Sequence, residues 1–361
     1  MDRGNFYLEE GFPFTGRRLE KLKAFLGKSG LDYDSQIQYS VMLCTKDGRL
    51  AGCGSRQDNV LKCIAIEDEF QGEGLLQAVV TELMKNACQE GFPHLFLFTK
   101  PQYREIFGDM GFYYVMDTRN MLLMENRREG IREYVKKEAE PFQRDERKPV
   151  GAIVMNANPF TKGHRYLIRQ AARDCRLLHV FVLSQDASEF PSQVRLKLVQ
   201  EGCRDLEGVY VHGSSKYLIS HATFPDYFLK DKANASDQAA VLDLKIFGVY
   251  FKEAFHIERR YVGEEPFSTI TRLYNEQMKK LLPGYGIEVV EIPRARAEDK
   301  IISATLVREK FLEGKLEEVE KLVPASTYGY LASREGQALR ETLLEKAGLS
   351  RGFEEFQRDR L

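Results

Sequence analysis

One short segment of the chain combines residue types that could bind a phosphate and stabilise charge that builds up on it. Thr161, Lys162, Gly163 and His164 come soon after an apolar run, Val150–Met155. Thr161 is a good helix N-cap for the amide of His164, and the free amides of a helix start favour an anion. Gly163 removes a side chain where a ligand would approach the backbone. We therefore expect His164 to point over the strand ends. The alternative is an ordinary capped helix with a satisfied histidine.

A second segment near the end of the chain could hold the same anion. It runs from Ile302 to Arg308 and opens a helix that we expect to end at Gly314. Ser303 is a plausible N-cap, and its hydroxyl, that of Thr305 and the nearby amides would form a second phosphate site. Arg308 lies one turn later and offers a fork of donors. Taken alone, this segment could equally be an ordinary capped helix.

The two segments need a scaffold that brings them to one edge, and the second half of the chain has a suitable pattern. Its continuous apolar runs are typical of parallel strands that are covered on both faces. Such a pattern predicts a doubly wound α/β domain, whose ligands bind beyond the carboxyl ends of the strands. The expected strands are 150–155, 177–183, 208–212, 261–263 and 287–292, with helices at 162–174, 191–204, 237–253 and 268–281.

The first part of the chain alternates strands and helices in a different order. Asp47-Gly48 predicts a hairpin turn, and the charged stretch 125–148 is expected to be a solvated helix and linker. Strands are expected at 37–44, 50–56, 60–66, 95–98 and 112–116, and helices at 74–90 and 101–109. We therefore divide the chain into 1–130, a linker 131–148, a second domain 149–330 and a helical tail 331–361.

Composition excludes several classes of protein. The chain has 361 residues and a formal net charge of -1, which argues against a dedicated nucleic-acid binder. It has no apolar run long enough for a membrane span, and its first residues form no signal-peptide core. The six cysteines are scattered without metal-ligand spacing. We expect reduced thiols, a cytoplasmic protein, and neither a disulfide framework nor a metal site.

Together, the two segments resemble the signatures of the nucleotidylyltransferase superfamily. These signatures are a T/H-x-G-H loop after the first strand and an I-S-S/A-T-x-x-R segment near the end. Here they are Thr161–His164 and Ile302–Arg308. Members attack the α-phosphate of ATP and release pyrophosphate, and the chain has no Walker A motif that would offer another route to ATP. Because the first position is Thr161 and not histidine, we assign the transition-state role to His164 alone.

Three longer segments resemble the citrate lyase ligase family. They are Asn158–Leu167, Tyr217–Pro225 and Arg260–Pro266. This resemblance implies an acid–thiol ligase that uses ATP with Mg²⁺. Such an enzyme joins acetate, through acetyl-adenylate, to the thiol of a CoA-derived prosthetic group on the acyl-carrier subunit of citrate lyase. It implies no nucleic-acid or membrane partner.

The resemblance also implies roles for individual residues. His164 would contact the α-phosphate oxygens in the transition state, while Lys162 and Arg308 would hold the β- and γ-phosphates and the departing pyrophosphate. The adenine would lie near Gly263. The residues expected to bind the nucleotide are Asn158, Thr161, Gly163, Gly263, Ser303 and Thr305.

In the first domain, Gln71-Gly72-x-Gly74 resembles the acyl-CoA loop of the GNAT acetyltransferases, Q/R-x-x-G-x-G/A. The last small position of that loop is Leu76 here, and no catalytic acid or base for acetyl transfer is evident. We therefore expect Gln71, Gly72 and Gly74 to bind the CoA-like arm in a GNAT-like α+β domain.

Other functions remain open at this point. One is an adenylyltransferase with a phosphopantetheine or mononucleotide acceptor, and another is a GNAT-type acetyltransferase. A non-catalytic binding or regulatory module is a third.

Overall fold

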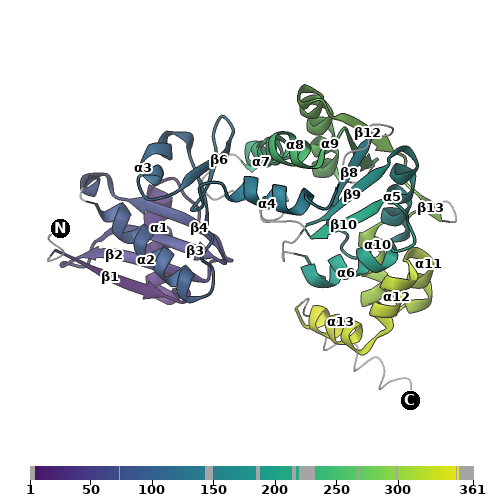
Figure 1. Cartoon of the computed structure of the whole chain (residues 1–361). Helices are drawn as coiled ribbons and strands as arrows, with labels where there is room; N and C mark the ends of the chain where they lie inside the picture. The colour runs from purple at the N-terminus through teal and green to yellow at the C-terminus, as the bar shows by residue number, and fades with distance from the viewer. Residues whose placement is uncertain are drawn as a thin grey trace, which may run out of the picture. The chain divides into compact units, whose positions relative to one another are not determined.

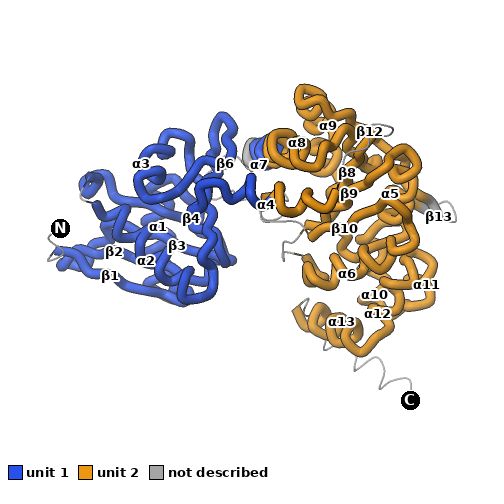
Figure 2. Tube along the Cα trace, in the orientation of Figure 1, with its two compact units in different colours: residues 1–134, 224–242 blue, residues 135–223, 243–361 orange. Residues whose placement is uncertain are grey.

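The computed structural model describes residues 5–72, 74–142, 149–183, 188–213, 217–218, 232–266, 268–297, 300–346 and 348. The chain divides into two compact units, residues 1–134 with 224–242 and residues 135–223 with 243–361 (Figure 2). Most of the family-like segment 217–225 lies outside the described residues. So do 143–148 of the expected linker and 349–361 of the expected tail.

The first unit is built on a seven-stranded mixed sheet with the order β1-β2-β3-β4-β5-β7-β6. Neighbouring strands are antiparallel except β4 and β5, which are parallel. This arrangement confirms the expected α+β fold, and it adds β1 and β7, which we did not expect. The strands are β1 (Phe6–Gly11), β2 (Tyr39–Thr45), β3 (Leu50–Gln57), β4 (Val60–Ile66), β5 (Phe96–Thr99), β6 (Tyr113–Asp117) and β7 (Leu122–Glu125).

Helix α2 (Leu75–Gln89) covers part of this sheet and places Val79, Val80 and Leu83 in its core. Helix α1 (Gly16–Lys28) was not expected, and the segment expected as a helix at 101–109 is a 3₁₀ turn followed by α3 (Arg104–Gly108). The parallel strands β4 and β5 are paired only at Val60–Phe96 and Leu61–Leu97 within the described residues. The two strands therefore separate toward their carboxyl ends.

The sequence predicted a solvated helix and linker for the charged stretch after the first sheet, and this prediction was wrong in part, because the helix there has a buried face. Helix α4 (Gly130–Ala139) buries Ile131, Val135 and Ala139, which are spaced by four residues and form one face. Glu125 is also buried, at the end of β7, where its carboxylate lies 2.6 Å from His94 Nε2. The many charged residues of this stretch made its amphipathic pattern hard to recognise, because the apolar residues are few, although they are regularly spaced.

The second unit contains a five-stranded sheet with the order β10-β9-β8-β11-β12, and every pair of neighbours is parallel (Figure 1). The first strand, β8, is central, so the strand order reverses between β8 and β11. Such a switch point is where open α/β sheets bind ligands. The strands are β8 (Val150–Met155), β9 (Leu177–Val182), β10 (Val209–Gly213), β11 (Arg259–Gly263) and β12 (Glu288–Ile292).

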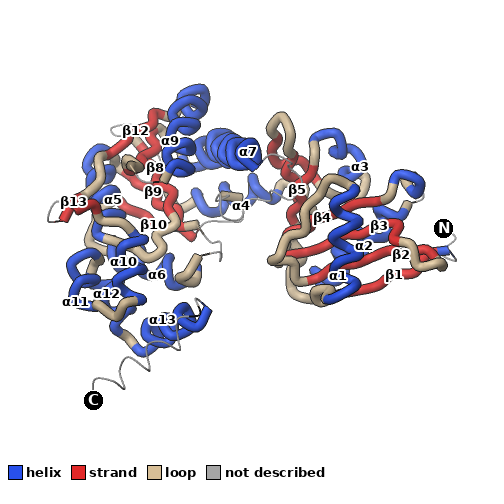
Figure 3. The backbone as a smooth tube through the Cα atoms, turned by 180° about the vertical axis from the view of Figure 1, so that it is seen from behind, coloured by secondary structure: helices blue, strands red, loops and turns tan. Residues whose placement is uncertain are grey.

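Helices cover both faces of this sheet, which confirms the doubly wound fold (Figure 3). Alternate residues of β9 point to opposite faces, so Val180 packs with Ile168 of α5 (Lys162–Asp174), whereas Phe181 contacts Phe255 of α8 (Lys252–Phe255). The helix expected at 237–253 is three elements: α7 (Lys232–Ile246), a π-helix (Phe247–Phe251) and α8. The remaining helices before the hairpin are α6 (Ser192–Gly202) and α9 (Thr269–Leu281).

The chain ends in a group of helices that follows a short hairpin, β13 (Arg296–Ala297) and β14 (Lys300–Ile301). Phe190, Val307, Phe311, Val319 and Leu331 form their shared core. None of the helices in the described part of the chain is both long and apolar enough to cross a membrane. The helices are α10 (Ala304–Leu312), α11 (Leu316–Leu322), α12 (Ala325–Ala332) and α13 (Arg334–Lys346).

Candidate active site

The start of α5 has the geometry expected from the sequence. Thr161 has extended backbone dihedrals, and its Oγ1 accepts from the amide of His164 at 3.3 Å. The imidazole reaches back in turn, and its Nδ1 accepts from the amide of Thr161 at 3.1 Å. The helix therefore begins with a reciprocal capping box in which a histidine takes the place of the usual Glu or Gln. Among the described residues, the amides of Lys162 and Gly163 have no partner, so they remain available to an anion.

This capping box fixes the proton of His164. A backbone amide can only donate, so Nδ1 must be the unprotonated nitrogen, and the neutral ring carries its proton on Nε2. Burial, and then the positive charge of Arg294, lower the pKa of His164 to about 4. At neutral pH the ring is thus an uncharged Nε2–H donor. Thr161 fixes the orientation of the ring.

The second expected segment lies against the first. Ser303 caps α10 by accepting from the amide of Leu306 at 3.1 Å. A Cβ atom added to Gly163 would be 3.2 Å from the carbonyl oxygen of Ile302. Gly163 is therefore needed for the close approach of the two helix starts, in addition to the ligand access that we expected. The two segments meet at the carboxyl edge of the sheet.

Arg308 ties these segments together. Its Nη1 donates to the carbonyl of Asn158 at 2.7 Å, and its Nε lies 3.0 Å from a carboxylate oxygen of Glu189. Asn158 donates its side-chain amide to Glu189, and its side-chain oxygen accepts from the amide of Phe190 at 3.0 Å. Thr305 is exposed beside this arginine, 3.4 Å from Nη2. The expected residues Asn158, Thr305 and Arg308 thus lie in one network, together with Glu189, which the sequence reasoning missed.

Arg195 also supports this network and was not identified from the sequence. Its side chain is fully buried, and its Nη1 donates to the carbonyls of Asn156 and Leu183 at 2.7 and 2.6 Å. Its Nε donates to the carbonyl of Phe190 at 2.9 Å. One guanidinium therefore fixes the loops that follow β8 and β9. The only signal in the sequence is that Arg195 opens a helix after a strand, which is weak because most such arginines are exposed.

Lys162 is held away from the sheet. Its Nζ donates to the carbonyls of Glu320 and Lys321 at 3.0 and 2.9 Å, at the C-terminal end of α11. The exposed face of α5 beside it borders a cleft of about 590 Å³. This cleft is also lined by Arg165, Arg169 and Ile302. To bind a phosphate, Lys162 would have to leave the α11 carbonyls, where it stabilises the helix end.

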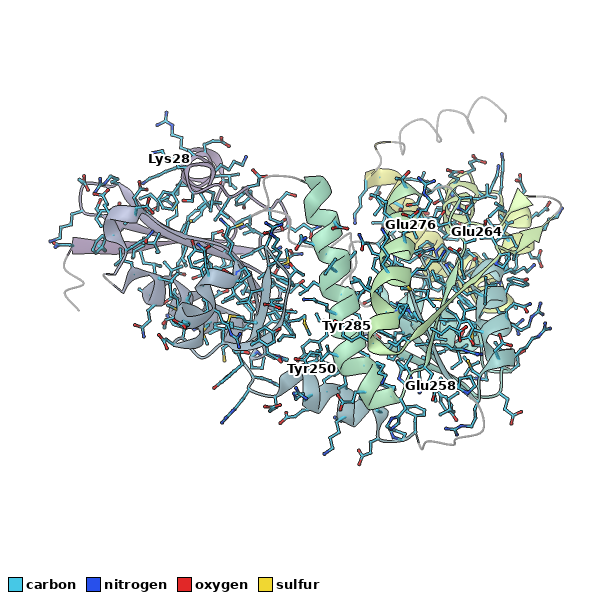
Figure 4. The ribbon with its side chains drawn as sticks, turned by 90° about the horizontal axis from the view of Figure 1, so that it is seen from above. Lys28, Tyr250, Glu258, Glu264, Glu276 and Tyr285 are labelled. Atoms are coloured by element: carbon cyan, nitrogen blue, oxygen red, sulfur yellow. The ribbon has the colours of Figure 1, made fainter. Side chains whose placement is uncertain are left out.

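Gly263 ends β11, next to β8 at the switch point. A Cβ added there would have one neighbour within 4 Å, Leu167 Cδ2 at 4.0 Å, so there is open space beside this backbone. Glu258 and Glu264 flank the strand, and their labels mark its two ends in Figure 4. Arg294 lies just past the end of β12 and donates to the carbonyl of Glu264 at 2.6 Å. We did not select Arg294 from the sequence, although a basic residue just after a parallel strand is a signal for this edge.

The expected loop residues of the first unit meet in a separate cleft. Gln71, Gly72 and Gly74 line a cleft of about 740 Å³ together with the separated ends of β4 and β5. Gly72 and Gly74 have φ values of +88° and +72°, which favour glycine. The cleft wall is largely apolar near Leu97 and Phe107. Apolar walls suit a partly apolar ligand better than a free phosphate.

In the part of the chain that the structure describes, no group of three or more His, Cys, Asp and Glu side chains could hold a metal ion. The second unit instead combines helix N-termini, a neutral imidazole donor and arginine side chains around one edge. Groups of this kind can stabilise negative charge on a phosphate without a protein nucleophile.

Comparisons with known proteins identify relatives of this chain. Residues 150–331 match a family model described as the citrate lyase ligase C-terminal domain. A Klebsiella pneumoniae protein named citrate (pro-3S)-lyase ligase is 41% identical over 319 residues, which cover 87% of this chain and 92% of that protein.

Solved structures align at lower identity. An acyl-CoA N-acyltransferase from Pseudomonas aeruginosa is 15% identical, with a TM-score of 0.29 over 34% of this chain and 99% of that chain. A bifunctional NMN adenylyltransferase/ADP ribose pyrophosphatase from Francisella tularensis is 13% identical, with a TM-score of 0.34 over 58% of this chain and 57% of that chain. The identity to the Klebsiella protein, over most of both chains, is the stronger finding.

Proposed function

The chain belongs to the citrate lyase ligase family, and we propose that it activates citrate lyase by acetylating a thiol on the acyl-carrier subunit. The thiol belongs to the CoA-derived prosthetic group of that subunit. The acetyl group comes from acetate, and the reaction consumes ATP and releases AMP and pyrophosphate. This proposal includes a cytoplasmic location, which the scattered cysteines support.

In the first step, a carboxylate oxygen of acetate attacks the α-phosphorus of ATP. The bond from this phosphorus to the oxygen that bridges to the β-phosphate breaks, and pyrophosphate leaves. Negative charge builds on the α-phosphate oxygens, where the Nε2–H of His164 donates. The amides of Lys162 and Gly163 face the same anion from the start of α5.

The departing pyrophosphate needs cations that can exchange partners. Lys162 is bound to backbone carbonyls, and Arg308 is bound to the carbonyl of Asn158 and to the carboxylate of Glu189. A phosphate oxygen carries a charge and accepts stronger hydrogen bonds than a carbonyl, so exchange onto the β- and γ-phosphates is favourable. Ser303 and Thr305 would bind the same phosphates at the start of α10, and Asn158 supports them from the loop after β8. Mg²⁺ would enter with ATP, whose phosphates supply its ligands.

In the second step, the carrier sulfur attacks the acetyl carbon of acetyl-adenylate. The bond from this carbon to the AMP oxygen breaks, AMP leaves and the thiol proton passes to solvent. The protein needs no nucleophile of its own for either step. Its contribution is to hold the two reactants in line and to stabilise charge.

The observation that carries this proposal is the close approach of the two phosphate-binding helix starts. The Ile302 carbonyl lies 3.2 Å from the Cβ position of Gly163, and Arg308 donates to Asn158 across 150 positions of sequence. The test is ATP–pyrophosphate isotope exchange with and without acetate. Acetate-dependent exchange is expected. Exchange that is independent of acetate but requires a pantetheine phosphate or a mononucleotide would favour the adenylyltransferase alternative.

We also propose that the cleft of the first unit holds the CoA-derived arm of the carrier. Its support is that Gln71, Gly72 and Gly74 line one cleft with the separated strands β4 and β5. Gly72→Val and Gly74→Val should raise the KM for the carrier at least tenfold and leave ATP–pyrophosphate exchange unchanged.

Gly91→Ala is the matched control for these variants. Gly91 also has a positive φ, +85°, but it does not line the cleft. An unchanged KM for the carrier in both valine variants would contradict this docking role. Acetyl transfer from acetyl-CoA without ATP would instead favour the GNAT-type acetyltransferase alternative.

A further inference from the structure

Arg294 is a partly buried cation that the first step does not yet use. It follows β12, and its side chain is 24% exposed. Its Nε donates to the carbonyl of Glu264 at 2.6 Å, and its Nη2 is paired with the carboxylate of Glu265, a side chain that is only 9% exposed. These two contacts fix the plane of the guanidinium. Within the described part of the chain, Nη1 has no partner.

The backbone next to Arg294 lies where the two proposed phosphate-binding segments meet. The next residue, Ala295, accepts from the amide of Ile302 at 3.3 Å. Ile302 in turn packs against Gly163, one residue before His164. The charge of Arg294 is close enough to the imidazole to lower its pKa, after burial itself. The backbone therefore brings the segment of Arg294 and the segment of His164 to the same part of the carboxyl edge of the sheet.

This pairing has a chemical consequence. A cation beside a histidine that must stay uncharged destabilises the protonated ring, so the arrangement favours an anion between the two groups. Glu265 alone does not account for Arg294, because its other carboxylate oxygen already accepts from the amide of Ser268 at 3.1 Å and orders that loop. A guanidinium with a free nitrogen matches a carboxylate or a phosphate, both of which present paired oxygens.

We propose that Arg294 is a further substrate-binding residue, which holds an anionic oxygen of the reacting groups beside His164. That oxygen belongs to the carboxylate of the acid or to the α-phosphate that it attacks. The identity of the reacting groups rests on the proposed function, whereas the binding of an anionic oxygen by Arg294 does not.

The test compares three substitutions in the full chain by acetate-dependent ATP–pyrophosphate exchange. Arg294→Gln removes the charge, and we expect the KM for acetate or for ATP to rise at least thirtyfold. The substrate whose KM rises identifies the oxygen. Arg294→Lys keeps the charge without the fork, and should fall between the wild type and the glutamine variant.

Glu265→Gln distinguishes a role of Arg294 in substrate binding from a role in holding the loop of Glu265. It removes the partner of Arg294 and leaves the cation, so its effect on KM should be at least tenfold milder than that of Arg294→Gln. Arg259→Gln is the matched control, because it breaks an exposed ion pair with Glu288 at the other end of β11. An Arg294→Gln variant within threefold of wild type would overturn the proposal. So would a Glu265→Gln variant that is equally impaired.

A second readout does not depend on turnover. The His164 imidazole can be followed by NMR while acetate and ATP are added separately to the wild type and to Arg294→Gln. We expect binding of at least one of them to be weakened at least thirtyfold by the substitution. Without acetate-dependent exchange in the wild type, the proposed function fails. In that case the ATP titration alone tests the role of Arg294. An unchanged affinity for ATP in Arg294→Gln overturns that role.

Discussion

Replacing His164 by Gln and by Glu should separate its role in the reaction from its role in the fold. Both side chains are the usual third residue of a capping box and can accept from the amide of Thr161, as Nδ1 does. We therefore expect each variant to keep the free energy of unfolding within about 1 kcal/mol of wild type, the typical value of an N-cap interaction. Only Gln can also donate toward a phosphate.

The rates of the two variants should differ widely. Loss of one preorganised donor to a developing oxyanion lowers kcat by about 10²- to 10³-fold, or about 2.7–4 kcal/mol. Glu loses the donor and adds a negative charge beside the phosphate, so its loss should exceed about a thousandfold. Gln keeps a neutral donor and should lose only about tenfold.

The assay is acetate-dependent ATP–pyrophosphate exchange, with thermal unfolding of each variant as the control for folding. A Glu variant within tenfold of wild type would show that His164 does not face the reacting phosphate. A Gln variant no more active than the Glu variant would show that donation from Nε2 is not its contribution.

Three further predictions concern the same edge of the sheet. Because the pKa of His164 is about 4, its titration should not change the ATP–pyrophosphate exchange rate between pH 6 and 8. A change in rate centred near pH 6.5 that disappears in the Gln variant would contradict the neutral state of the ring. Arg195→Lys keeps the charge but cannot reach all the carbonyls that Arg195 binds, so urea unfolding should show a loss of about 2–4 kcal/mol; a loss below about 0.5 kcal/mol would refute the buried clamp. Gly163→Ala places a methyl group 3.2 Å from the Ile302 carbonyl oxygen. Mild overpacking of this kind costs roughly 1.4 kcal/mol, so the KM for ATP should rise about tenfold. Gly27→Ala, in open space on α1, is its control.

Where a signal is local, the sequence predicted the structure closely. Helix α5 begins and ends where expected, because a threonine cap precedes a regular apolar stripe that contains Ile168 and Ala171. Ser303 caps α10, and Gly314 follows that helix with a φ of +76°. Continuous apolar runs located β8 and β9 because both faces of a parallel strand are buried.

Where burial depends on distant neighbours, the sequence was silent. Arg195 lies in a helix where charged residues usually face water, and it is held inward by loop carbonyls that include two from residues 12 and 39 positions away. Arg294 and Glu189 lie in loops whose course no periodicity describes. Strand β1 was missed because acidic and apolar residues are mixed in it, and its partner β2 comes from beyond the next helix. The capped starts of α5 and α10 were therefore predictable, but the groups that hold them were not.

The contact between Arg308 and Asn158 has a consequence for synthesis of the chain. The two residues are 150 positions apart, so the first helix start is translated long before its partner exists. Domains generally fold as units during translation, at about 5–20 residues per second. All seven strands of the first sheet precede residue 126, whereas the proposed phosphate-binding edge cannot close until residue 308 has left the ribosome. A chain that stalls earlier would present the first sheet and its cleft without the contact that joins the two helix starts.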